Sequence, residues 1–116
     1  MLIASGALSH TFWPLGQLRD HEAAGVEHIF SPQACHADRD RIDWLSKGEH
    51  ARVLGTMPEF LAFRPEARFA HYLMMAGARG EGRCTARAEP YSDYKNSVGT
   101  GQMHLWCPRP PGGWTA

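Results

Sequence analysis

Histidine is abundant in this chain, and it is the side chain whose charge changes most easily near neutral pH. Seven histidines occur among 116 residues. His10 and His36 are the candidate catalytic residues of a small hydrolase or nucleotide-using transferase that would need a general base. Serine and cysteine are also present, so many Ser-His-Asp or Cys-His pairings can be drawn and spacing selects none of them. The histidine content therefore leaves the reaction open.

Cysteine and histidine together could hold zinc, since thiolate and imidazole are the ligands that this metal prefers. The possible ligand set is Cys35 or His36 with Cys84, His104 and Cys107. His104 and Cys107 are separated by an odd number of positions on a predicted strand, which directs their side chains to opposite faces. The chain has no CxxC pair, and free cysteines are commonly buried apolar groups. We therefore expect no metal site and no cofactor.

A long polar segment over residues 90–101 has the composition of a recognition loop. Tyrosine supplies a large rigid contact area with a polar tip, and the glycines allow the backbone to approach a partner closely. Their spacing does not match a phosphate-binding motif, and an ordinary hairpin connection is the alternative. The predicted partner-binding residues are Tyr91, Asp93, Tyr94, Lys95 and Asn96.

The N-terminal residues Leu8-Ser9-His10-Thr11, followed by a short predicted helix and Gly25, resemble the opening of some ADP-ribosyltransferases. The resemblance covers about a fifth of the chain. It implies that His10 would grip a nicotinamide nucleotide. That family also has a late catalytic glutamate on a strand, and Glu89 departs from this pattern because it directly precedes a proline.

Charge and cysteine content limit the function classes and the compartment. Twelve basic and twelve acidic side chains disfavour a protein that binds mainly by neutralising nucleic-acid phosphates. Three cysteines are an odd number in a chain long enough to fold without disulfides, which favours a reducing compartment. Polar residues, glycine and proline interrupt residues 1–18, which predict neither a signal peptide nor a membrane span. We expect a soluble cytoplasmic protein.

The length predicts one domain over residues 1–116, with an irregular tail over 108–116. Proline and capping signals predict helices that start near Pro14, Ser31 and Pro65. Runs of strand-forming residues predict strands over 1–8, 26–30, 51–55, 59–63, 83–88 and 102–107. Residues 51–55 and 59–63 are either neighbouring strands or one bent strand. We expect an α+β fold with about three helices packed on a small, mostly antiparallel sheet.

These features favour a compact binding module that occupies a surface of a larger protein or nucleoprotein partner, as small regulators and inhibitors do. An aromatic loop is present, whereas no catalytic constellation has the required spacing. A phage or mobile-element inhibitor fits this description. One alternative is a small histidine-based enzyme, which requires several histidines to converge in one pocket. Another is a structural or assembly subunit, which requires a large exposed apolar patch.

Overall fold

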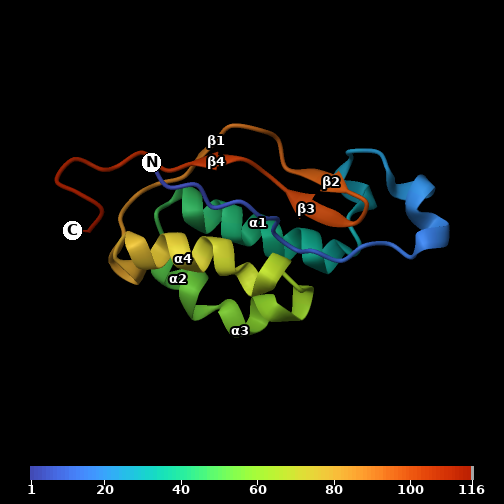
Figure 1. Cartoon of the computed structure of the whole chain (residues 1–116), viewed down its shortest axis with the longest axis horizontal. Helices are drawn as coiled ribbons and strands as arrows, with labels where there is room; N and C mark the ends of the chain where they lie inside the picture. The colour runs from blue at the N-terminus through green and yellow to red at the C-terminus, as the bar shows by residue number, and fades with distance from the viewer. Residues whose placement is uncertain (116) are drawn as a thin grey trace.

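The computed structural model describes residues 1–115 and contains four α-helices and two antiparallel sheets of two strands each (Figure 1). The α-helices are α1 (Pro32–Ser46), α2 (His50–Gly55), α3 (Met57–Phe60) and α4 (Ala70–Ala78). The 3-10 helices are η1 (Leu15–His21), η2 (Val26–His28), η3 (Leu61–Phe63), η4 (Glu66–Phe69) and η5 (Glu81–Arg83). The strands are β1 (Glu89–Pro90), β2 (Lys95–Ser97), β3 (Thr100–Gln102) and β4 (Leu105–Trp106). The α+β prediction is confirmed, with more helices than the three expected.

Helix α1 is the central element, and its start follows from its first residues. The Ser31 hydroxyl accepts a hydrogen bond from the Ala34 amide at 3.0 Å, and Pro32 occupies the first turn, where its missing N–H is harmless. Figure 1 shows the strands on one side of α1 and the other three α-helices on the other side. Side chains from both layers therefore meet along this helix.

The hydrophobic core lies mainly between α1 and the other α-helices. Phe60 and Phe69 meet edge to face with ring centroids 5.1 Å apart, and Tyr72 stacks on Phe69 at 4.9 Å. The buried core residues are Leu8, Ala37, Leu45, Val53, Phe60, Phe69, Tyr72, Ala76 and Ala88. Ala88 belongs to the segment that leads into β1, so the core also extends to the side of α1 that faces β1 and β4.

Five predicted strands are wrong. Within residues 83–88, Arg83 ends η5 and Cys84 forms only an isolated bridge, and the strand β1 begins afterwards at Glu89. Residues 51–55 and 59–63 are mostly helical, because burying Val53 and Phe60 together against α1 and α4 needs the helical repeat rather than the strand repeat. Residues 26–30 begin with the turn η2, and residues 1–8 form no regular strand. The backbone of Leu8 instead donates to the Gly101 carbonyl at 3.0 Å, which leaves only the end of that segment anchored.

Two predicted helix starts are also revised. Pro14 precedes only the 3-10 helix η1, which has no buried residue and so no core contact to extend it. Pro65 precedes η4, in which Ala67, Arg68 and Phe69 have positive φ, and the α-helix begins afterwards at Ala70. This turn places Phe69 in the core beside Phe60.

Strands β2 and β3 form a tight hairpin that holds an outer lobe, which we define as residues 11–30. The turn residues Val98 and Gly99 both have positive φ, as a two-residue hairpin turn of the favoured handedness requires. Their carbonyls accept hydrogen bonds from Trp13 at 3.1 Å and from Phe30 at 3.0 Å. The lobe and this hairpin lie together at one end of a molecule measuring 51 × 27 × 20 Å (Figure 1).

No helix within residues 1–115 combines the length and the apolar character needed to cross a membrane.

Candidate functional site

Strands β1 and β4 form a two-stranded ribbon. In the segment that leads into β1, successive side chains point to the two faces of this ribbon in turn. Cys84, Ala86 and Ala88 are buried, whereas the residues between them are exposed. Successive side chains of an extended chain point to opposite faces, so this pattern assigns one face to the core and the other to solvent. The Ala88 amide donates to the Leu45 carbonyl at 2.8 Å and fixes the inner face against α1.

The register of β1 and β4 gathers exposed side chains from both strands. Glu89 lies opposite Trp106, and the Tyr91 amide donates to the His104 carbonyl at 2.9 Å. Opposite residues share a face in an antiparallel pair, as do residues two apart on one strand. We call this surface the outer face, and its residues are Arg87, Glu89, Tyr91, His104 and Trp106. All five are exposed.

Two aromatic rings dominate the outer face. Tyr91 is 71% exposed and Trp106 is 44% exposed, and neither belongs to the core cluster. Tyrosine, tryptophan and arginine are the residue types enriched among residues that dominate binding energy in protein interfaces. One arginine and one glutamate balance the charge, which suits contact with a protein better than contact with a phosphate backbone.

The five predicted partner-binding residues occupy two different environments. Tyr91, Asp93 and Lys95 are exposed, as a role in binding requires. The Tyr94 ring is half-buried, and its hydroxyl donates a hydrogen bond to the Asp38 carboxylate. Asn96 is buried. The last two side chains are therefore held by internal contacts and position the segment instead.

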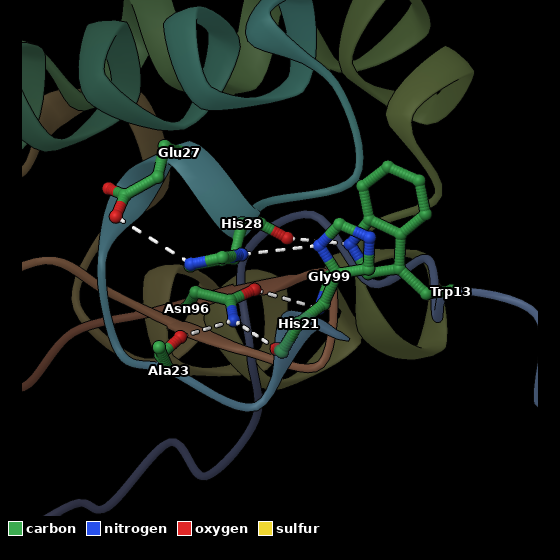
Figure 2. Close-up of polar contacts among 7 residues, drawn as sticks. All are labelled: Trp13, His21, Ala23, Glu27, His28, Asn96 and Gly99. Atoms are coloured by element: carbon green, nitrogen blue, oxygen red, sulfur yellow. Dashed lines mark hydrogen bonds and ion pairs between the residues drawn. The ribbon is translucent and has the colours of Figure 1, made fainter. Parts of the chain in front are cut away.

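Asn96 ties the β2–β3 hairpin to the outer lobe (Figure 2). Its amide nitrogen donates to the carbonyls of His21 and Ala23, both at 2.9 Å, and its amide oxygen accepts from Gly99 at 2.7 Å. The side chain thus satisfies three backbone groups at once. Such a residue fixes the lobe rather than contacting a partner.

Asp38 anchors the ribbon side to α1. Its side chain is fully buried and accepts hydrogen bonds from the Ser9 amide at 2.8 Å, the Ser9 hydroxyl at 2.7 Å and the Tyr94 hydroxyl. Burial raises the pKa of Asp38, although these hydrogen bonds and the positive charge of Arg41 lower it. Burial, followed by the negative charge of Asp38, raises the pKa of Tyr94. We call Ser9, Asp38 and Tyr94 the inner contact. Because Asp38 is fully buried, a substrate cannot reach it, and the contact stabilises the fold.

His50 has an equally internal role. It is fully buried in α2, where Nε2 donates to the Ala86 carbonyl at 2.7 Å and Nδ1 therefore accepts from the Tyr72 hydroxyl at 3.0 Å. Burial lowers the pKa of His50, and the positive charge of Arg79 lowers it further. The neutral imidazole joins three segments of the fold.

The two candidate catalytic histidines lie in different places. His36 lines a surface cavity of about 460 Å³ beside α1, together with the carboxylates Asp40 and Glu59 and the buried Arg41. The His10 amide donates to the Arg64 carbonyl at 2.9 Å, and its ring lies edge on to Phe12. Only His36 among the histidines lines this cavity or its 360 Å³ neighbour. These two cavities therefore gather no histidine cluster.

The residues considered as possible zinc ligands, at a site that the sequence does not favour, are the free thiols Cys35, Cys84 and Cys107 together with His36 and His104. Within residues 1–115, no three His, Cys, Asp or Glu side chains form a group that could hold a metal ion. His104 is on the exposed outer face, whereas Cys84 is buried.

Four residues of the outer face were not among the predicted partner-binding residues: Arg87, Glu89, His104 and Trp106. The signal was present in the sequence, because polar and apolar residues alternate from Gln102 to Leu105 as they do from Arg83 to Glu89. The strand pairing that joins the two exposed sets is what the sequence lacked.

No protein-family model matches this chain, and a search of curated proteins finds no similar sequence.

Proposed function

We propose that this protein is a binding module that occupies a surface of a larger protein or nucleoprotein partner through its outer face. The observation that carries the proposal is the exposure of Tyr91 and Trp106 on one side of a ribbon whose other side packs on α1. Exposed aromatic rings that do not stabilise the core are available for a partner. Asp93 lies between β1 and β2, and Lys95 is the first residue of β2. Both are exposed, so they complete the proposed contact.

The form of the surface supports a macromolecular partner. Small-molecule sites are concave, and neither of the two cavities beside α1 includes an outer-face residue. A ribbon face with two large rings and compensating charges suits a protein surface, where rings fill shallow pockets and charges set the orientation. A regulator or inhibitor encoded by a phage or mobile element is the biological role that we propose. The three free thiols support a reducing, cytoplasmic setting.

The proposal is tested by affinity capture of the full-length tagged chain from a lysate of the native host. We expect wild type to retain a discrete partner, and we expect the double variant Tyr91→Ala/Trp106→Ala to reduce the amount of retained partner by about tenfold or more. Met74→Ala is the matched control, because Met74 on α4 is also 71% exposed and lies outside the outer face. Equal retention by the double variant would refute the proposed surface. If the retained partner is a second copy of this chain, the protein is an assembly subunit.

The cavity beside His36 lacks the histidine cluster that the enzyme alternative requires, but its lining gives that alternative a direct test. An imidazole and two carboxylates around one cavity could bind and deprotonate a small substrate. A panel of nucleotides and small esters, screened by thermal shift, tests this alternative with His36→Ala as the comparison variant. Stabilisation of wild type by a panel compound, together with its loss in His36→Ala, would favour an enzyme over a binding module.

A further inference from the structure

Two imidazoles face each other in the outer lobe (Figure 2). His21 ends η1 and His28 ends η2, and their Nδ1 atoms are 3.2 Å apart. The His28 side chain is 24% exposed and His21 is partly exposed, so neither ring is fully buried. Two ring nitrogens in this arrangement either share one proton or bind one cation between them.

The separation of the nitrogens fits a shared metal ion. Zinc holds imidazole nitrogens at about 2.0–2.1 Å in tetrahedral geometry, which places two ligands of one ion about 3.3 Å apart. The observed 3.2 Å agrees with this value. We propose that His21 and His28 bind one divalent transition-metal ion of the zinc class through their Nδ1 atoms. Neutral imidazole suits these ions better than it suits magnesium or calcium.

Glu27 lies near the second ring nitrogen of His28, where metal-binding histidines usually have a polar partner. The His28 Nε2 atom lies 3.6 Å from the Glu27 carboxylate, on the side of the ring away from His21. A carboxylate there favours the tautomer with its proton on Nε2, which leaves the Nδ1 lone pair directed at the ion.

The lobe holds both histidines in place without a metal ion. The Trp13 ring stacks on the His21 ring with centroids 3.7 Å apart, and its Nε1 donates to the His28 carbonyl at 2.6 Å. Asn96 fixes the backbone of His21 as well, by donating a hydrogen bond to its carbonyl. Because these contacts already set the ligand geometry, binding an ion needs little ordering of the chain.

The pair provides two protein ligands, and residues 1–115 contain no three-residue metal-binding group around it. Water or a donor atom from another molecule completes the coordination. An ion held in this way is exchangeable, and the fold does not depend on it. This proposal concerns the outer lobe and stands independently of the binding role proposed for the outer face.

Calorimetric titration of the full chain with Zn²⁺ under reducing conditions tests the site. We expect binding of one ion, weakened about tenfold or more in His21→Phe and in His28→Ala. The phenylalanine retains a ring against Trp13, so His21→Phe is expected to remain folded. We expect Glu27→Gln to weaken binding to a smaller extent, and His71→Gln, which removes a histidine on α4 outside the lobe and the outer face, to leave it unchanged.

Nuclear magnetic resonance gives a readout that does not depend on the variants. One equivalent of Zn²⁺ should shift the ring resonances of His21 and His28 together and leave those of His104 in place. If Zn²⁺ does not bind, or if it binds without moving these two rings, the pair is hydrogen-bonded only and the metal site is rejected.

Discussion

Tyr91 and Tyr94 are close in sequence, yet the structure assigns them to opposite sides of the ribbon segment. Tyr91 stands on the outer face, 71% exposed, whereas the Tyr94 hydroxyl reaches inward to the buried carboxylate of Asp38. The residue type is the same, and the direction of the side chain decides its role. The outer face and the inner contact should therefore respond in opposite ways to substitution, one through binding and the other through stability.

The inner contact combines a buried charge with three donors. Asp38 accepts two hydrogen bonds from Ser9 and one from Tyr94, so α1, the N-terminal segment and the ribbon segment meet at one carboxylate. The outer face has no comparable role in the fold, since its rings lie outside the core cluster. This difference gives three predictions, and the buried ring of His50 gives a fourth; they are ordered by the expected change in stability.

The largest change is expected for Asp38→Ala. Removing the carboxylate leaves the Ser9 amide, the Ser9 hydroxyl and the Tyr94 hydroxyl without their partner in a buried site. We expect a loss of about 3 kcal/mol or more in the free energy of unfolding, measured by urea denaturation. A loss below about 1 kcal/mol would show that this contact does not hold the ribbon on α1.

A smaller change is expected for Tyr94→Phe, which removes only the hydroxyl. The lost hydrogen bond to a charged acceptor predicts destabilisation of about 1.5–3 kcal/mol. The same substitution at the outer face, Tyr91→Phe, should change the free energy of unfolding by less than about 0.5 kcal/mol. Equal effects at the two positions would remove the distinction between the outer face and the inner contact.

Lowering the pH should weaken the interior through His50. Because burial lowers the pKa of His50 below its ordinary 6.5, the unfolded state takes up a proton more readily than the folded state. The stability contributed by the neutral ring is present above pH 6.5 and is lost as the pH falls through the lower folded-state pKa. The thermal midpoint should fall as the pH is lowered from about 7.5 to about 5.5.

The control for this pH effect is His50→Gln, which removes the titrating ring. Asp38 acts in the opposite direction, because its raised pKa favours the folded state as the pH falls. The difference between wild type and His50→Gln isolates the histidine from this opposing contribution. An identical pH dependence in both proteins would contradict the assignment of a buried neutral imidazole.

The smallest change in stability is expected for Tyr91→Ala and Trp106→Ala on the outer face. Both rings lie outside the core cluster, so Tyr91→Ala should unfold within about 0.5 kcal/mol of wild type, and Trp106→Ala, whose ring is 44% exposed, within about 1.5 kcal/mol. Calorimetry or urea denaturation measures this value for each variant. A large loss in either variant would mean that the ring stabilises the fold, which would weaken its proposed role in binding.

The sequence predicted α1 well and its buried side less well. Ser31 and Pro32 form a local start signal, so neither depends on distant parts of the chain. Helical spacing predicts a buried stripe of Cys35, Ile42 and Leu45. The structure buries Leu45, leaves Cys35 and Ile42 only partly buried, and buries Asp38 and Arg41 in addition. Those two polar residues are covered by contacts with distant segments, which helical periodicity does not reveal.

The candidate sites depend even more on long-range contacts. Residues 90–101 were predicted as the binding segment from composition, but Trp106 joins Tyr91 only through the register of β1 and β4. His21 and His28 are brought together by two short 3-10 helices, Trp13 and the distant Asn96. Local composition therefore located a surface segment, and tertiary contacts determined which of its side chains are free.

Photo-crosslinking in the native host tests the central claim most directly, because it maps contact residue by residue. A benzophenone amino acid placed at position 106 of the full chain should form one discrete crosslinked species with a larger partner. The same probe placed at position 74 on α4 should form none. Crosslinking at position 74 but not at position 106 would contradict the assignment of the outer face as the binding surface.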